Sequence, residues 1–404
     1  MNETFEGALD FFDSFQQHLS HITTLKLNIA HNFMNIPSPS SVDSFFHSLF
    51  TNLESLKQLE ELKLNMPYFP SMQNTHLQHF AEALQSLKSL RNLACNFTRM
   101  KSPNEAVLSL FQTIQTLNPL QVLDLTFFQV DLTRSNLETI LSQIPSENLD
   151  FFNLTLGVPQ RDATRITPIK MIQGLSPSEF AVEKITNLWK GKSNSIFSGF
   201  SKFTALSKLN LQLANCNISI QDYKQLGQIL KRMNSLSSLA IKFPLLDTIN
   251  NFEGLQNFTS CFKEITNLRE LGLIFAADRV DDQQIGVLAS NLVGCRKLES
   301  FRLMLRYALL LSPKSLESLL IGLKDLQILK FLHLLFDFRK AFPEKALFEF
   351  LQSLAVLRNL EDLRFVDQWG EAVRQIIVEL PESLKRYQNL KNLRKFIVNH
   401  FRYI

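Results

Sequence analysis

Glycine and proline are scarce in this sequence: of 404 residues, 12 are glycine and 14 are proline. So few turn-forming residues argue against a disordered chain and against a β protein with many tight turns. Cysteine is rare as well, with no CxxC pair among its four positions, which are Cys95, Cys216, Cys261 and Cys295. This spacing predicts reduced, mostly buried thiols in a cytoplasmic protein rather than disulfides or a zinc site.

The sequence also lacks a strong excess of charge and a long apolar run. It has 42 basic and 38 acidic residues, a near balance that disfavours a dedicated nucleic-acid binder. The most apolar stretch, 319–336, is interrupted by Lys324, Lys330 and His333, so we predict no membrane insertion. The first residues, MNETFEGALDFFDSF, carry acids where a secretory signal needs bases, so we expect no such signal.

What the sequence does contain is one alternating segment, repeated along the chain. Clear copies are LEELKLNM from Leu59 and LSKLNLQL from Leu206. The residues that open the alternating runs are Leu25, Leu62, Leu93, Leu123, Phe152, Leu209, Leu239, Leu271, Phe301, Leu332, Leu363 and Phe396. These anchors lie about 30 residues apart, except for one step of 57 from Phe152 to Leu209. Because that step is almost two periods, we expect a degenerate copy near 180–182 and about 12 to 13 units in all.

Each unit combines a strand with a helix. The run from Leu62 to Met66 alternates with a period of two, which predicts a strand with one buried face. The residues after it have helical spacing, and Asn74 and Thr75 stand where we expect the N-cap. The apolar stripe of this helix is Leu77, Phe80, Ala81, Leu84 and Leu87.

A strand and a helix in one short unit cannot close a core, so the units must stack. Strands stack at roughly 4.8 Å, and helices are wider than that, so the stack must curve. We therefore predict an α/β solenoid with a parallel sheet on its concave face and helices on its convex face.

These copies resemble the ribonuclease-inhibitor type of leucine-rich repeat over nearly the whole chain. The nearest copy is LNLQLANCNISIQDYKQLGQIL, which puts Cys216 and Ile218 at the cysteine and leucine positions of that family's pattern. The Phe-rich third apolar position resembles repeats of protist, especially ciliate, proteins. In most other copies the cysteine or asparagine after the strand is missing, and phenylalanines such as Phe97 and Phe243 take the neighbouring inward position. The resemblance implies a horseshoe-shaped leucine-rich-repeat solenoid that binds a macromolecule.

The chain is thus expected to form one solenoid over residues 1–404. Its parts would be an N-terminal capping helix (1–20), regular repeats (21–156), an irregular repeat (157–202), regular repeats (203–380) and a C-terminal cap (381–404). The irregular stretch contains Trp189 and several prolines, and it fits either a loop that touches a partner or a decayed repeat. The two ends, one acidic and one basic, fit solvated caps or a head-to-tail or polyanion contact.

Outward strand residues should form columns along the concave face, where a protein partner would bind. The amino-terminal half of these columns is polar, while the carboxy-terminal half sets a cationic column beside an apolar one. Adjacent arginine and apolar residues are typical of interface cores, so we predict partner contact there. The predicted contact residues are Lys63, Asn65, Asn153, Lys242, Ile274, Arg302, Met304, His333, Leu335, Arg364 and Val366. The alternatives are that a register slip places the apolar column in the core, or that crowded neighbours shield it.

Local motifs of catalysis, cofactor binding and metal binding are missing. Gly191-Lys192-Ser193 resembles the end of a phosphate loop, but Thr186 replaces the first glycine. His76 and His79, like His18 and His21, lack a third ligand at metal-site spacing, so we read them as surface or capping residues. The Ran GTPase-activating protein shares this fold and uses a loop arginine, for which Arg306 is the one candidate here.

The sequence therefore favours a non-enzymatic protein-binding scaffold, without cofactor, nucleic acid or small-molecule substrate. One alternative is a structural subunit of a large ciliary, cytoskeletal or mitochondrial assembly. Another is a regulator of a GTPase or nuclease. Nucleic-acid binding would need a continuous basic path, which Glu61, Asp124 and Glu270 interrupt.

Overall fold

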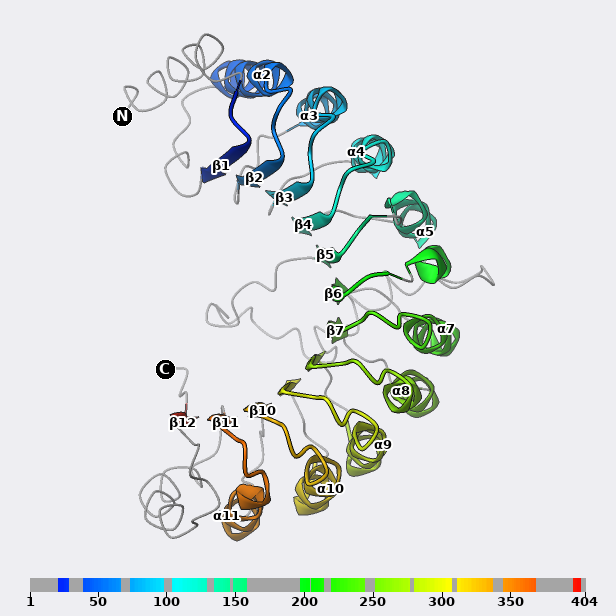
Figure 1. Cartoon of the computed structure of the whole chain (residues 1–404), viewed down its shortest axis with the longest axis vertical. Coiled ribbons are helices and arrows are strands. Elements are labelled where there is room, and N and C mark those ends of the chain that lie inside the picture. Colours follow the sequence, from blue (N-terminus) through cyan, green and yellow to red (C-terminus); the bar gives the residue numbers. More distant parts are fainter. Residues whose placement is uncertain are drawn as a thin grey trace, which may run out of the picture. The chain divides into compact units, whose positions relative to one another are not determined.

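The computed structural model resolves the chain into two compact units, residues 1–206 and 207–404. The described residues are 21–28, 39–66, 73–97, 104–128, 134–145, 148–157, 197–203, 205–213, 219–243, 251–276, 280–306, 311–336, 344–367 and 395–400. In both units strands and helices alternate along the chain, and in each unit the described helices lie on one face of its sheet (Figure 1). We call the other face, which no described helix covers, the open face.

The first unit contains a parallel sheet of five strands in sequence order. The strands are β1 (Thr24–Asn28), β2 (Glu61–Asn65), β3 (Asn92–Phe97), β4 (Val122–Phe128) and β5 (Phe151–Gly157). The helices are α2 (Pro39–Ser55), α3 (Asn74–Ser86), α4 (Asn104–Gln115) and α5 (Arg134–Gln143), with a 3-10 turn, η2 (Ser198–Lys202), that contacts α5.

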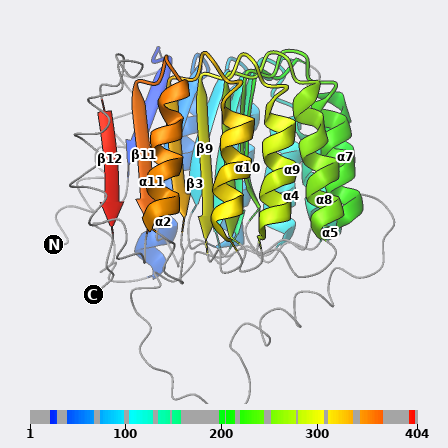
Figure 2. The same cartoon turned by 90° about the horizontal axis from the view of Figure 1, so that it is seen from below.

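The second unit continues the same plan with seven parallel strands in sequence order. They are β6 (Lys208–Leu213), β7 (Ser238–Phe243), β8 (Glu270–Ala276), β9 (Ser300–Arg306), β10 (Phe331–Phe336), β11 (Asp362–Asp367) and β12 (Lys395–His400). The helices are α7 (Ile220–Leu230), α8 (Asn251–Thr259), α9 (Asp282–Leu292), α10 (Pro313–Leu323) and α11 (Glu344–Ser353), with 3-10 turns η3 (Ser260–Lys263) and η4 (Leu354–Val356). Figure 2 shows α8 to α11 side by side as one layer.

All twelve sequence anchors lie in strands, as predicted. Eleven of them have described side chains, and each of these is buried beneath the helices. Burying a leucine of this size contributes about 1.5–3 kcal/mol, so every unit adds its own share to the core. The period of two thus selects one face for the core and leaves the residues between the anchors on the open face.

The predicted apolar stripe of α3 is buried as well, with Leu77, Phe80 and Leu84 fully covered. The N-cap prediction was wrong: α3 starts at Asn74 and Gln73 is its N-cap. His76, at the third helical position, accepts the backbone N–H of Gln73 on Nδ1 at 2.9 Å. His76 therefore takes the place of the glutamate or glutamine of a capping box. For this reason the N-cap is Gln73, one residue before the Asn74 that the usual cap residue types predicted.

Turns before the strands repeat one hydrogen-bond pattern in both units. The N–H groups of Glu60 and Glu61 both donate to the Thr23 carbonyl, at 2.8 and 2.9 Å. The N–H groups of Lys330 and Phe331 likewise donate to the Glu299 carbonyl, at 2.8 and 3.0 Å. Each carbonyl thereby fixes where the next strand starts, which keeps neighbouring strands in register.

Phenylalanines at the ends of the strands explain part of the high Phe content. Phe97 and Phe127 are buried with ring centroids 5.5 Å apart, and Phe243 stacks on Phe275 at 5.0 Å. These aromatic contacts link one unit to the next through the core. They occupy the inward position that the sequence assigned to them after the alternating run.

The α/β leucine-rich-repeat solenoid is thus confirmed by parallel strands that alternate with helices at one repeated period. Several predictions fall outside the described residues: the capping helix at 1–20, the degenerate copy near 180–182, the phosphate-loop-like 191–193, and most of the proposed cap at 381–404.

Candidate partner-binding face

The strand registers arrange the outward residues of each unit in three rows across its open face. In the second unit one row contains Arg302, His333 and Arg364, aligned on β9, β10 and β11. The row nearer the strand ends contains Ile274, Met304 and Leu335. A third row, at the strand starts, contains Ser300, Phe331 and Asp362. The two columns predicted from the sequence are therefore real rows, and a third lies beside them.

In the first unit the outward polar side chains bond to one another. The Asn65 amide donates to the Asn28 side-chain oxygen at 3.0 Å, and the Asn96 amide donates to Asn65 at 2.9 Å. In the next row Asn153 donates to the Asp124 carboxylate. Lys63 lies 2.7 Å from Glu61, whose pKa is lowered, first by the hydrogen bond from that ammonium group. Each of these side chains therefore already has at least one protein partner.

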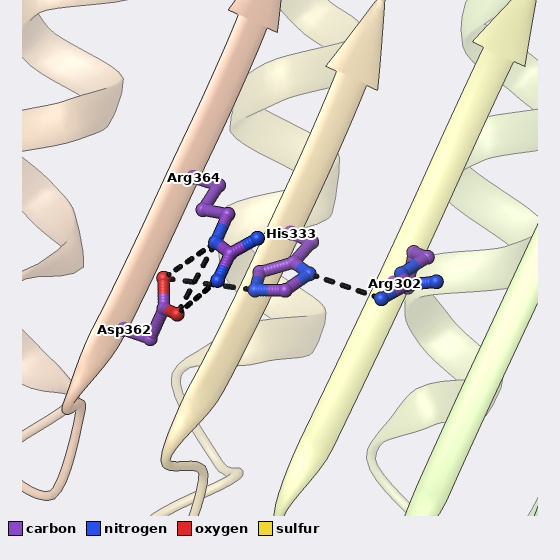
Figure 3. A network of polar contacts seen from close by, with 4 residues as sticks. All are labelled: Arg302, His333, Asp362 and Arg364. Carbon is purple, nitrogen blue, oxygen red and sulfur yellow. Dashed lines mark hydrogen bonds and ion pairs between the residues drawn. The ribbon is translucent and has the colours of Figure 1, made fainter. Parts of the chain in front are cut away.

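The second unit has a charged network on its open face, drawn in Figure 3. Arg364 donates hydrogen bonds to the Asp362 carboxylate from two nitrogens, Nε at 3.0 Å and Nη2 at 2.8 Å. His333 lies between this pair and Arg302, with Nε2 3.6 Å from Asp362 and Nδ1 3.4 Å from Arg302 Nη2 (Figure 3). Since a guanidinium can only donate, His333 Nδ1 is the acceptor and the Nε2 hydrogen faces Asp362.

Electrostatics in this network follow from burial and from the alternation of charge. Burial lowers the pKa of His333, as do Arg364 and Arg302, while Asp362 opposes them. His333 is therefore neutral near pH 7. The hydrogen bond to Asp362 raises the pKa of Arg364, because the carboxylate stabilises its charged form. Arg302 is exposed, and among the described residues no carboxylate pairs with it.

Apolar side chains flank the charged row on both sides. Phe331, at the start of β10, is 39% exposed, which is unusual for a phenylalanine. Ile274, Met304 and Leu335 on the other side are half-buried on the open face. The alternative reading, that a register slip puts this apolar column in the core, is excluded because their neighbours in sequence fill the core instead.

Ten of the eleven predicted contact residues have described side chains, and all ten lie on an open face. Three belong to the first unit: Lys63, Asn65 and Asn153. Seven belong to the second: Lys242, Ile274, Arg302, Met304, His333, Leu335 and Arg364. Val366 aligns with Leu335 in the strand register, but its side chain lies outside the described residues.

Sequence reasoning missed Phe331 and Asp362, which complete the face of the second unit. Both stand one residue before an anchor, where the period of two also points outward. Extending each alternating run by one residue toward the amino terminus would have found them.

Other reactive groups in the described part of the chain include buried thiols and a histidine at a helix start. Three cysteines, Cys95, Cys261 and Cys295, are free and buried, and burial raises the pKa of the Cys295 thiol to about 12. No group of three or more His, Cys, Asp or Glu residues among those described could hold a metal ion. His76 has a structural role at the start of α3, and the side chain of Arg306 lies outside the described residues. Of the helices described, none has the length and apolar character needed to cross a bilayer.

Comparisons with known proteins give little beyond the repeat class. No family model matches the sequence, and no curated protein does. One similar solved structure is a leucine-rich-repeat protein of Leptospira interrogans, 14% identical, with a TM-score of 0.27, covering 95% of this chain and 98% of that one. Another is the functional domain of InlJ from Listeria monocytogenes, 12% identical, with a TM-score of 0.26, covering 79% of this chain and 65% of that one. At these TM-scores neither likeness bears on function, and the leucine-rich-repeat assignment stands on the strand register and the repeated sequence.

Proposed function

We propose that this leucine-rich-repeat chain is a non-enzymatic scaffold that holds a protein partner on the open face of its sheet. The observation that carries the proposal is the composition of that face in the second unit. There an exposed arginine without a carboxylate partner among the described residues, Arg302, stands between apolar side chains that are partly solvent-exposed. Arginine and exposed aromatic residues beside aliphatic ones are typical of interface centres.

A specific observation also favours the second candidate, a structural subunit of a large assembly. Ile321 on α10 is 57% exposed, and Val356 in η4 is 40% exposed, both in the helical layer. Apolar side chains here would suit contacts made through the helices rather than through the sheet.

Site-directed photo-crosslinking in cells separates the two candidates. A benzophenone amino acid replaces Met304 on the open face in one variant and Ile321 on the helical face in another. The scaffold proposal expects a crosslinked companion from position 304 and none from position 321, with companions identified by mass spectrometry. Crosslinks from position 321 alone would support the structural subunit and reject the scaffold proposal.

Four finer assignments complete the proposal. The full helix in most described units supports the ribonuclease-inhibitor type of repeat. The free, buried Cys95, Cys261 and Cys295 support a reducing, cytoplasmic setting, since an oxidising compartment favours paired thiols. The Phe-rich repeat supports kinship with protist proteins. The shared period on both sides of residue 206 supports one continuous solenoid.

A further inference from the structure

The two open faces differ in net charge. In the first unit Lys26 and Lys63 balance Glu61 and Asp124, two against two, so the net charge is zero. Among the outward residues of β6 to β11 whose side chains the structure describes, four are basic and two are acidic, which gives a net charge of +2. The basic residues are Lys208, Lys242, Arg302 and Arg364, and the acidic ones are Glu270 and Asp362. A partner of negative charge is therefore favoured on the second unit.

The two arginines of that face, Arg302 and Arg364, differ in whether a carboxylate pairs with them. The charge of Arg364 is neutralised by Asp362. Because the Asp362 side chain is only 11% exposed, water competes little for this ion pair. Arg302 is exposed, and among the described residues its polar contact is the neutral His333 at 3.4 Å. A guanidinium can bind a carboxylate through two parallel N–H groups, and Arg302 still has most of its donors to offer.

The apolar side chains stand at a fixed distance from this cation. Outward residues on one strand repeat every two positions, about 7 Å apart. Phe331 therefore lies one step from His333 toward the strand start, and Leu335 lies one step toward the strand end. On the neighbouring strand Met304 is one step from Arg302. A ligand that reaches all three rows must carry charge in its middle and apolar groups on both sides.

We propose that the open face over β8 to β11 binds a short acidic-apolar segment of the protein partner, with a carboxylate on Arg302 and apolar side chains on Phe331 and on the Met304–Leu335 pair. This rests on the proposed function and names the chemistry of the partner. In an extended segment the flanking apolar residues stand two positions from the acid, and in a helical segment three or four.

Polyanions fit this face less well. A phosphate or a nucleic-acid backbone gains most from several unpaired cations, but Arg364 is already engaged and Asp362 and Glu270 repel an extended polyanion. The apolar rows would gain nothing from phosphate. A single carboxylate between apolar groups uses both features of the face.

The test starts from a random heptapeptide library displayed on phage and selected on the full chain. We expect enrichment of peptides with one Asp or Glu flanked by apolar residues at the spacings above. Enriched peptides are then synthesised with a fluorophore, each beside a twin carrying Asn or Gln in place of the acid. Loss of the charge should weaken binding by about tenfold or more, because a charge-assisted hydrogen bond is removed.

Variants of the chain locate the peptide. R302Q should weaken binding of the acidic peptide about as much as the acid-to-amide change does, and the two changes together should not add. F331S should weaken binding of both twins equally. K26Q is the matched control, because Lys26 is a cation on the other open face whose partner is Glu61, and it should leave binding unchanged.

The possible outcomes separate failure of the acidic-apolar proposal from failure of the scaffold proposal. Selected peptides that are basic or uncharged, yet lose affinity in M304S, would overturn the acidic chemistry and keep the scaffold proposal. Binding that ignores every open-face variant, or a selection without enrichment, would overturn both. Preference for a phosphopeptide twin over the aspartate peptide would show that the face reads phosphate, against the proposal.

Discussion

At the scale of single residues, His76 shows how one side chain can start a helix. It is 3% exposed, its Nδ1 accepts the Gln73 backbone N–H, and its Nε2 lies 2.9 Å from Asp43. Replacing it by alanine removes that acceptor and with it the hydrogen bond from the Gln73 N–H at the start of α3. We expect His76→Ala to lower the free energy of unfolding by about 1–2 kcal/mol, in the range of lost caps, as measured by urea denaturation.

The matched control is His76→Gln, because glutamine at the third helical position can also accept the N-cap N–H. It should recover most of the loss. If both variants are equally unstable, the histidine contributes through packing against Phe46, whose ring centroid is 4.8 Å away, and not through the cap.

Acid should weaken the same site. Burial lowers the pKa of His76 below its ordinary value, although Asp43 opposes the shift. The unfolded chain then takes up a proton near pH 6.5 while the folded chain does not, so the stability contributed by His76 is present above about pH 6.5 and is lost as the pH falls through the folded-state pKa. This histidine was expected on the surface or at a cap, and only the cap role holds. Its burial could not be read from the sequence, because the burial depends on how α2 packs against α3.

At the scale of elements, close approach between helices limits what residues α10 can hold. A Cβ built on Gly322 would lie 2.4 Å from the backbone oxygen of Ala289 on α9. Alanine normally stabilises a helix interior by about 1 kcal/mol over glycine. Here the backbone contact must open instead, so we expect Gly322→Ala to destabilise the chain by about 1–3 kcal/mol in thermal or urea unfolding.

Gly286 on α9 provides the control for that substitution. The nearest atom to its added Cβ is the Ser318 hydroxyl, an ordinary contact at 3.7 Å. Gly286→Ala should therefore be neutral or slightly stabilising. A Gly322→Ala variant as stable as Gly286→Ala would mean that α9 and α10 can move apart at little cost.

Strands were easier to predict than helix ends. Alternation placed every anchor in a strand, because a one-residue slip would expose each leucine to water. The start of α3 was missed because Gln73 and His76 are not common cap residues. The outer row with Phe331 was missed for a different reason: the alternating run was taken to begin at its first buried residue, while the strand begins one residue earlier.

At the scale of the whole molecule, one repeated strand–helix motif forms two open faces that differ in how their polar side chains are paired. In the first unit, hydrogen bonds join the side chains of Asn28, Asn65 and Asn96. The second leaves Arg302 and Phe331 exposed. Both use the same alternation, so the difference lies wholly in outward residues, which contribute little to folding. This is why the sequence can suggest a binding face on the fold but cannot name the partner.

Proton uptake should accompany binding to the second face. His333 is neutral near pH 7, since burial and the neighbouring Arg364 and Arg302 lower its pKa while Asp362 raises it. A carboxylate docked on Arg302 would lie near His333 Nδ1, which is 3.4 Å from that guanidinium, and would favour the imidazolium form. Binding of the acidic peptide should therefore raise the pKa of His333.

By linkage, affinity for that peptide should rise as the pH falls from about 7.5 to 6, by several-fold and by less than the tenfold that one pKa unit allows. The peptide carboxylate stays ionised in this range, because an aspartate titrates near pH 3.9. Fluorescence anisotropy at each pH, with circular dichroism to show that the chain stays folded, measures the effect. His333→Gln should bind with the same affinity at every pH in the range. An affinity that falls on acidification, or a slope that survives in His333→Gln, would place the docked carboxylate away from Arg302 and His333.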